Sequence, residues 1–339
     1  MEKLLIKGGA SLKGEISCSG AKNAALPMIA ATILSDEDII LKNLPYLQDI
    51  TTMFELLGSM GANILLNENT DFTISANNLK EKEARYELVK TMRASILVLG
   101  PLVAKYGEAK IALPGGCAIG SRPVNYHLDA LEQLGATITL KNGYIEASAK
   151  KLIGSKIKFD GITVTGTENI MMAACLAEGT TTLTNVAKEP EIIDLAEFLN
   201  KMGAKISGAG SDEITIEGVE RLYGADHSIP ADRIEAGTYL VAAAVTKGEI
   251  KINGINPNRL IKVLDKLIET GAKVETSEDS ISLTMNKDKP KPVDITTAPF
   301  PEFPTDMQAQ FSVINALANG VSNIYETVFE NRFMHVQEL

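Results

Sequence analysis

The stretch FELLGSMGANI, residues 54–64, decides the fold because the chain contains three further copies of the same phrase. The copies are LDALEQLGATI at 128–138, DLAEFLNKMGAKI at 194–206 and VLDKLIETGAKV at 263–274. Each copy has apolar residues at helical spacing, then Gly-Ala, then the start of a strand-like run. The Gly-Ala glycines lie 74, 68 and 68 residues apart. Self-similarity at a nearly fixed period indicates a repeated supersecondary unit.

The segments between these phrases repeat as well. NIMMAACLAEGTTTLTNV, residues 169–186, matches TYLVAAAVTKGEIKINGI, residues 238–255. Each unit of about 70 residues therefore reads as an apolar helix, a Gly turn, a strand, a second helix ended by Gly, and a strand pair. This pattern predicts an α/β protein, made of α+β repeats, in which helices cover one face of each sheet.

Length and composition limit the class of protein. A chain of 339 residues is too long for one ordinary core, so we expect two domains. The net charge of −10 argues against nucleic acid or an anionic membrane as the main partner. The start, MEKLLIKGGASLKGE, is no signal peptide, and no run approaches membrane-spanning length, which predicts a cytoplasmic protein. The cysteines are then free thiols, with Cys18 and Cys175 expected in the core.

Two motifs combine a cation with a backbone suited to an anion. In SGAKNAALP, Lys22 and Asn23 fall at the start of a predicted helix, whose free N–H groups favour an anion. The alternative is a solvated lysine. In the Gly-rich loop LPGGCAIGSRPVNYH, Cys117 lies five residues before Arg122, and nearby cations would stabilise its thiolate. The alternative there is an incidental exposed cysteine.

Three further motifs place charged residues in unusual surroundings. Arg93 enters the apolar run TMRASILVLGPL, so its partner is either a protein carboxylate or a ligand oxyanion. In APFPEFPTDMQAQF, Thr305 and Asp306 open a predicted helix, and the alternative to a functional role is a plain N-cap. Arg332 follows a strand-like run in ETVFENRFMH, and the alternative is a surface residue. The three histidines are scattered, so the sequence gives no support for a metal site.

In this order and spacing, SGAKNAALP, MRAS, PGGCAIGSRPV, PTDMQAQF and FENRFMH resemble the enolpyruvyl transferase family, and most closely its members that use UDP-N-acetylglucosamine. The resemblance covers the whole chain. It implies an inverted α/β barrel of repeated βαβαββ units in two domains. One domain would span residues 22–229, and a discontinuous second domain would join 1–21 to 230–339. Substrates would bind in the cleft between them, and domain closure would exclude water.

The resemblance also implies a reaction and its residues. An enolpyruvyl group would move from phosphoenolpyruvate to the sugar 3′-hydroxyl with release of phosphate, at the first committed step of peptidoglycan precursor synthesis and without a cofactor. Cys117 would be the general acid, and the residue alkylated by fosfomycin, while Asp306 would be the base. Lys22, Arg93 and Arg122 would bind phosphoenolpyruvate. UDP-N-acetylglucosamine would contact Asn23, Arg93, Pro123, Val124, Asn125, Thr165, Gly166, Asp306, Val328 and Arg332.

Two departures from the family pattern stand out. Asn125 takes the place of the Asp expected beside the uracil. The repeat also stops at Leu339, inside what should be the second helix of a fifth unit, so we expect a C-terminally truncated chain with exposed apolar faces and weak or no turnover. Two other functions stay open. They are a non-catalytic sugar-nucleotide-binding paralogue and a shikimate-type enolpyruvyl transferase, against which the loop cysteine Cys117 counts.

Overall fold

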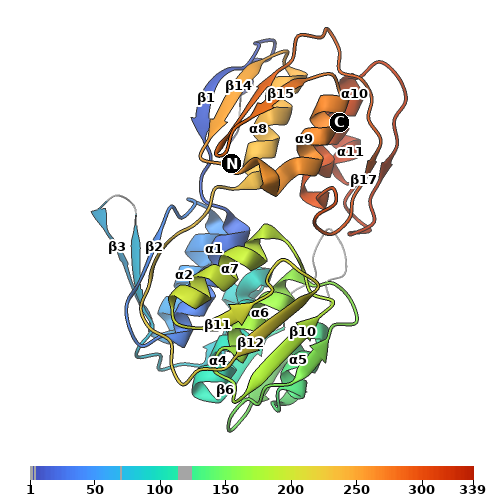
Figure 1. The fold of residues 1–339 in the computed structure, drawn as a ribbon. Helices are drawn as coiled ribbons and strands as arrows, with labels where there is room; N and C mark the ends of the chain where they lie inside the picture. The colour runs from blue at the N-terminus through green and yellow to red at the C-terminus, as the bar shows by residue number, and fades with distance from the viewer. Residues whose placement is uncertain (1–2, 4, 69–70, 114–123) are drawn as a thin grey trace. The chain divides into compact units, whose positions relative to one another are not determined.

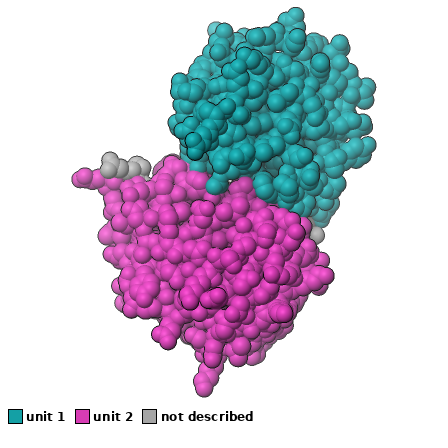
Figure 2. Space-filling model, viewed as in Figure 1, with its two compact units in different colours: residues 1–19, 231–339 teal, residues 20–230 magenta. Residues whose placement is uncertain are grey.

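The chain forms two compact units, residues 20–230 and residues 1–19 with 231–339 (Figure 2). The computed structural model describes residues 3, 5–68, 71–113 and 124–339. In both units, helices and strands follow one another in the order that the repeated phrase predicts (Figure 1). The predicted α/β repeat is therefore confirmed.

In the unit of residues 20–230, each repeat completes a four-stranded sheet. The strands are β2 Ile39–Lys42, β3 Asn63–Leu66, β4 Phe72–Ser75, β5 Glu83–Ala84, β6 Glu108–Ala112, β7 Thr137–Lys141, β8 Tyr144–Ser148, β9 Lys156–Lys158, β10 Thr180–Thr184, β11 Lys205–Ser207, β12 Glu213–Glu217 and β13 Asp226–Ser228. They form the sheets β13-β2-β4-β3, β5-β6-β8-β7 and β9-β10-β12-β11. Each sheet has one parallel pair and two antiparallel pairs, and one of the antiparallel pairs is a hairpin.

The helices of this unit fill the space inside the three sheets. They are α1 Lys22–Ala31, η1 Thr32–Leu34, α2 Gln48–Met60, α3 Tyr86–Val89, η3 Arg93–Val98, α4 Leu99–Tyr106, α5 Asn125–Gln133, α6 Val164–Ala174 and α7 Pro190–Lys201. The first helices of the repeats are buried over most of their length, as shown by residues 24–31 of α1 and 166–174 of α6. The amphipathic second helices bury one face only. Helices inside and sheets outside make this an inverted barrel (Figure 1).

The unit of residues 1–19 and 231–339 holds one four-stranded sheet and one parallel strand pair. The sheet β1-β14-β16-β15 is built from Lys13–Ser17, Glu249–Asn253, Ser280–Thr284 and Lys273–Thr276, and β17 Ile295–Thr296 pairs with β18 Ile324–Tyr325. Its helices are α8 Arg233–Val245, η4 Pro257–Leu260, α9 Ile261–Glu269, η5 Thr305–Met307, α10 Gln308–Leu317 and α11 His335–Glu338. Helices α8 and α10 pack together. None of the described helices is long and apolar enough to cross a membrane.

The glycines of the repeated phrase explain why each second helix stops where it does. Gly61, Gly135, Gly203 and Gly271 all have left-handed φ angles, between 93° and 111°. A residue with a Cβ rarely adopts this conformation, so Gly-Ala ends the helix and turns the chain into the next strand. Cys18 and Cys175 are buried free thiols, as predicted for the core.

Candidate functional site

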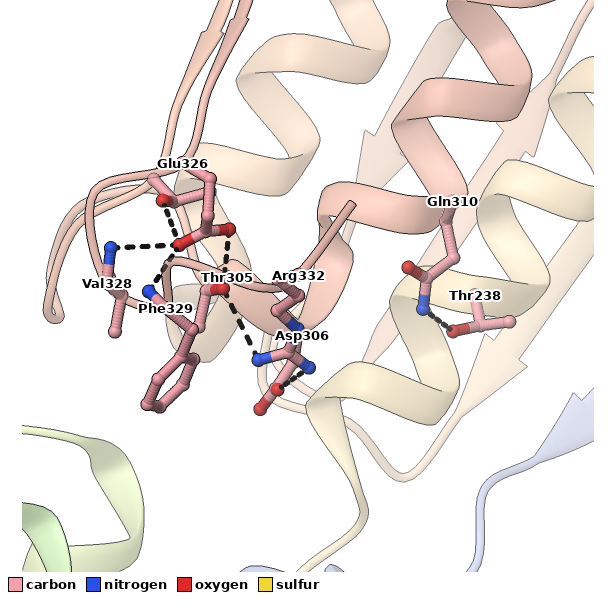
Figure 3. Close-up of polar contacts among 9 residues, drawn as sticks. Thr238, Thr305, Asp306, Gln310, Glu326, Val328, Phe329 and Arg332 are labelled. Atoms are coloured by element: carbon pink, nitrogen blue, oxygen red, sulfur yellow. Dashed lines mark hydrogen bonds and ion pairs between the residues drawn. The ribbon is translucent and has the colours of Figure 1, made fainter. Parts of the chain in front are cut away.

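In the unit of residues 231–339, Asp306 and Arg332 form an ion pair. Nη2 of Arg332 lies 2.5 Å from Oδ1 of Asp306, and Nη1 donates to Oγ1 of Thr305 at 3.3 Å (Figure 3). The N-cap of η5 is Pro304, and neither Thr305 nor Asp306 caps a helix, so the alternative of a plain N-cap is wrong. Arg332 has 22% of its side chain exposed and is paired with Asp306, so it is a partly buried arginine with a partner and not a freely solvated one.

Glu326, which sequence reasoning did not single out, lies at the centre of this site. Its Oε2 accepts a hydrogen bond from the Thr305 hydroxyl at 2.7 Å. Its Oε1 accepts from the backbone N–H groups of Val328, at 2.9 Å, and Phe329, at 3.1 Å (Figure 3). A carboxylate that binds N–H groups two and three residues ahead behaves as an N-cap does. The motif ETVF contains a carboxylate two and three residues before these N–H groups. The sequence alone, however, does not show that the chain turns directly after strand β18.

In the unit of residues 20–230, Lys22 begins the buried helix α1 as predicted. The preceding Gly20 packs so closely on Asn43 that a Cβ would lie 1.9 Å from the Asn43 carbonyl oxygen, so only glycine fits this turn. Nζ of Lys22 pairs with Oδ2 of Asp49 at 2.9 Å, with both side chains about one-third exposed. Asn23, next in the helix, is exposed.

A buried amide joins helix α6 to the segments before it. Asn169 is fully buried, and its Nδ2 donates to the Ile96 carbonyl and to Nδ1 of His127, both at 2.9 Å. Its Oδ1 accepts from the Gly100 N–H at 2.6 Å. Both amide hydrogens are therefore used, and Nδ1 of His127 must be an unprotonated acceptor.

The same contacts fix the state of His127. Burial, helped by the positive charge of Arg93, lowers the pKa of His127 to about 3, so the imidazole is neutral at pH 7. With Nδ1 accepting, the ring proton is on Nε2, which faces Oγ1 of Thr165 at 3.3 Å. The Thr165 oxygen accepts from the ring, and its own hydrogen remains for another acceptor. His127 thus contacts one predicted site residue, Thr165, and its pKa is influenced by the charge of a second, Arg93.

The start of α6 offers backbone N–H groups. Thr163 caps the helix by accepting from the Gly166 N–H at 3.1 Å. A Cβ at Gly166 would lie 2.4 Å from Cγ2 of Thr163, so this cap requires glycine. Val124 and Asn125 stand at the start of α5, which packs on α6. A helix N-terminus of this kind favours a phosphate or another anion.

The remaining predicted residues have different outcomes. Cys117, Arg122 and Pro123 lie outside the residues that the structure describes. Val328 belongs to the turn that Glu326 holds. The part of the chain that is described contains no cluster of three or more His, Cys, Asp or Glu side chains able to hold a metal ion.

Comparison with known proteins adds the family. A family model described as EPSP synthase (3-phosphoshikimate 1-carboxyvinyltransferase) matches residues 6–339. A UDP-N-acetylglucosamine 1-carboxyvinyltransferase of Hydrogenovibrio crunogenus (strain DSM 25203 / XCL-2) is 55% identical over 339 residues, which are 100% of this chain and 81% of the relative.

Solved structures share the fold. The enolpyruvyl transferase NikO from Streptomyces tendae superimposes with a TM-score of 0.85 at 24% identity, over 98% of this chain and 79% of NikO. An EPSP synthase from Acinetobacter baumannii gives a TM-score of 0.70 at 18% identity, over 94% and 74% of the two chains. Because the family model spans nearly the whole sequence and a relative matches all of it, this chain belongs to the EPSP synthase family of enolpyruvyl transferases.

Proposed function

We propose that this protein transfers the enolpyruvyl group of phosphoenolpyruvate to the 3′-hydroxyl of UDP-N-acetylglucosamine and releases phosphate. The observation that carries the proposal is the 55% identity, over the full chain, to an enzyme named for that acceptor. The family model alone does not choose the acceptor, since its description names 3-phosphoshikimate. The reaction would supply peptidoglycan precursors in the cytoplasm, and through them cell shape and division.

The proposed chemistry is an addition followed by an elimination. The Cys117 thiol gives a proton to C3 of phosphoenolpyruvate, and C2 gains oxocarbenium character. The sugar 3′-oxygen then forms a bond to C2 as its proton passes to Asp306. The resulting tetrahedral intermediate loses a proton from C3 and breaks its C2–O bond to phosphate. Phosphate leaves, and the C2–C3 double bond forms again on the sugar.

Asp306 is suited to the role of base by its contacts. One carboxylate oxygen is held by Arg332, and no described residue bonds to the other, so Oδ2 is available for a substrate hydroxyl. Such a base needs only hydrogen-bond reach to the proton it takes. Arg332, beside it, is proposed to contact the sugar nucleotide together with Val328 and Asn23.

Lys22, Arg93 and Arg122 are the proposed cations for phosphoenolpyruvate. A substrate that carries a phosphate and a carboxylate needs such a cluster in a chain of net charge −10. The pair of Lys22 with Asp49 is about one-third exposed, and exposed pairs of this kind contribute little to stability. A multiply charged anion would therefore displace Asp49 from Lys22.

The proposed sugar-nucleotide contacts on the larger unit come from two helix starts. Val124 and Asn125 begin α5, after Pro123, and Thr165 and Gly166 lie in the first turn of α6. The support for these contacts is chemical. A diphosphate finds free N–H groups at a helix start, and the Thr165 hydroxyl has a hydrogen to donate.

The test is phosphate release from phosphoenolpyruvate with UDP-N-acetylglucosamine or with shikimate 3-phosphate. We expect release with the sugar nucleotide only, with its loss in the presence of fosfomycin and in the Cys117→Ala variant. Release with shikimate 3-phosphate alone would assign the other acceptor. Binding of the sugar nucleotide without release, by a chain that is folded by circular dichroism, would replace the enzyme by a non-catalytic binding protein.

A further inference from the structure

We infer that Glu326 is a positioning residue for the proposed base: through the Thr305 hydroxyl it fixes Arg332, and through Arg332 it fixes the Asp306 carboxylate. The inference rests on the proposed function only for the role of Asp306. The chain of contacts itself is independent of that role, and all of its members lie in one unit (Figure 3).

The donor and acceptor of each hydrogen bond between Glu326 and Asp306 follow from the chemistry of the groups involved. A carboxylate can only accept, so the single hydrogen of the Thr305 hydroxyl points to Oε2 of Glu326, at 2.7 Å. The Thr305 oxygen is then left as an acceptor, and it takes a hydrogen from Nη1 of Arg332 at 3.3 Å. Nη2 of the same guanidinium holds Oδ1 of Asp306. The negative charge of Glu326 therefore orients a hydroxyl, which in turn orients the arginine.

Four donors surround the Glu326 carboxylate. Besides Thr305, they are the Thr297 hydroxyl, at 2.8 Å, and the N–H groups of Val328 and Phe329. Thr297 also accepts from the N–H of Thr327 at 3.0 Å, which extends the pairing of β17 and β18. The carboxylate thus links the strand pair, the turn that carries Val328 and the residue before Asp306. Replacing it by an amide of the same shape would put hydrogens where only acceptors fit.

Substitutions at Thr305 and at Glu326 should have different effects on kcat and KM. Thr305→Val removes the hydroxyl, keeps the β-branched shape and leaves the turn at Val328 in place. Its kcat should fall about tenfold, the effect of losing one hydrogen bond to a charged group, with both KM values unchanged. Glu326→Gln disturbs the turn as well, so its kcat should fall and its KM for UDP-N-acetylglucosamine should rise. Thr305→Ser, which restores the hydroxyl, should recover the wild-type kcat to within about threefold.

A matched control lies in the same unit. Gln310 of α10 donates to the Thr238 hydroxyl of α8 at 3.0 Å, and neither residue contacts Glu326, Thr305 or Arg332 (Figure 3). Thr238→Val is the same chemical change as Thr305→Val, at a hydrogen bond outside the chain of contacts. It should leave kcat and both KM values unchanged.

The experiment combines these kinetics with the ¹⁵N-resolved NMR signals of the Arg332 guanidinium, assigned by their loss in Arg332→Lys. We expect slowly exchanging Arg332 signals in the wild type, Thr305→Ser and Thr238→Val, and their collapse in Thr305→Val and Glu326→Gln. If Thr305→Val retains both the signals and kcat, or if Thr305→Ser is as impaired as Thr305→Val, the inference is wrong. A wild type that shows the signals but releases no phosphate would overturn the proposed function and leave the positioning by Glu326 standing.

Discussion

The two units each contain a polar network, and the two networks differ in whether their groups are charged or neutral. Around Asp306 the network contains ionisable groups: a carboxylate, a guanidinium and a second carboxylate meet in a partly buried site. Around His127 it is made of uncharged groups: the amide of fully buried Asn169, the imidazole of His127 and the hydroxyl of Thr165. The first network is partly exposed, with 22% of the Arg332 side chain and 37% of the Asp306 side chain exposed. The second network is buried, and a charged imidazole there would cost too much free energy, so His127 is neutral.

The difference has a functional meaning. A carboxylate that is about one-third exposed and has one oxygen left for a substrate can take a proton, which is the task proposed for Asp306. A buried neutral imidazole with pKa about 3 is far from exchanging protons at pH 7, so His127 is suited to hold a hydroxyl in one orientation. Four substitutions test this difference between the two networks.

The largest effect is expected for Asp306→Asn. An amide keeps the shape and one oxygen for Arg332 but cannot take the hydroxyl proton. General-base catalysis typically contributes between a hundredfold and ten-thousandfold, so kcat should fall by about a thousandfold. Steady-state phosphate release measures it, and a variant within tenfold of the wild type would remove Asp306 from the role of base.

Asn169→Leu should destabilise the larger unit strongly. The change leaves the Gly100 N–H and the Ile96 carbonyl buried without their partner, and each such group costs about 1–3 kcal/mol. We expect a loss of about 3 kcal/mol in the free energy of unfolding by urea. The exposed Asn67, whose side-chain amide donates to the Thr73 hydroxyl, is the control, and Asn67→Leu should change the stability by less than about 0.5 kcal/mol. Equal losses in the free energy of unfolding at the two sites would mean that the buried hydrogen bonds of Asn169 do not stabilise the fold more than an exposed one does.

His127 should make stability depend on pH in one direction. Its pKa is lowered from 6.5 to about 3 by burial, so below pH 6.5 the unfolded chain binds a proton that the folded chain does not. Its stabilising contribution is full above pH 6.5 and is lost as the pH falls towards 3. From pH 6.5 to 5, the wild type should lose about 2 kcal/mol relative to His127→Asn.

Chemical denaturation of both proteins across this range measures the difference. His227, whose pKa is also lowered, to about 4, is present in both and cancels. If the free energies of unfolding of the two proteins fell equally with pH, burial would not be what keeps His127 neutral.

The smallest effect is expected at Thr165. Thr165→Val removes the hydroxyl that His127 orients, and we expect about a tenfold rise in KM for UDP-N-acetylglucosamine with kcat unchanged, since one hydrogen bond to a charged group is lost. Thr165→Ser should remain near the wild type. A fall in kcat at constant KM would move Thr165 from binding to the chemical step.

Much of the fold was predictable because it repeats. Four Gly-Ala phrases mark four helix ends, and all four glycines have the left-handed conformation that the phrase requires. The start of α1 at Lys22 was also readable, since small residues precede an apolar run. The five-sheet arrangement was not, because the pairing of β13 with β2, or of β1 with β14, joins residues about 190 or 240 positions apart.

The site was predictable in its members and not in its contacts. Motifs identified Asp306 and Arg332 separately, and only the fold shows them paired. Glu326 escaped notice because its role depends on the turn after β18. The sequence did not identify His127 and Asn169 as partners because no periodic pattern connects the two residues. Their burial follows from the packing of α5 on α6. Thr305 read as a helix cap, yet its hydroxyl binds Glu326 instead.

A competition between the two acceptors tests the proposed reaction. The protein is given phosphoenolpyruvate with equal amounts of UDP-N-acetylglucosamine and shikimate 3-phosphate, and the products are identified by mass spectrometry and by the vinyl protons in ¹H NMR. We predict that only the sugar nucleotide gains the enolpyruvyl group, on its 3′-oxygen, with one phosphate released for each transfer. Enolpyruvyl transfer to shikimate 3-phosphate, or phosphate release with neither product, would contradict the proposed function.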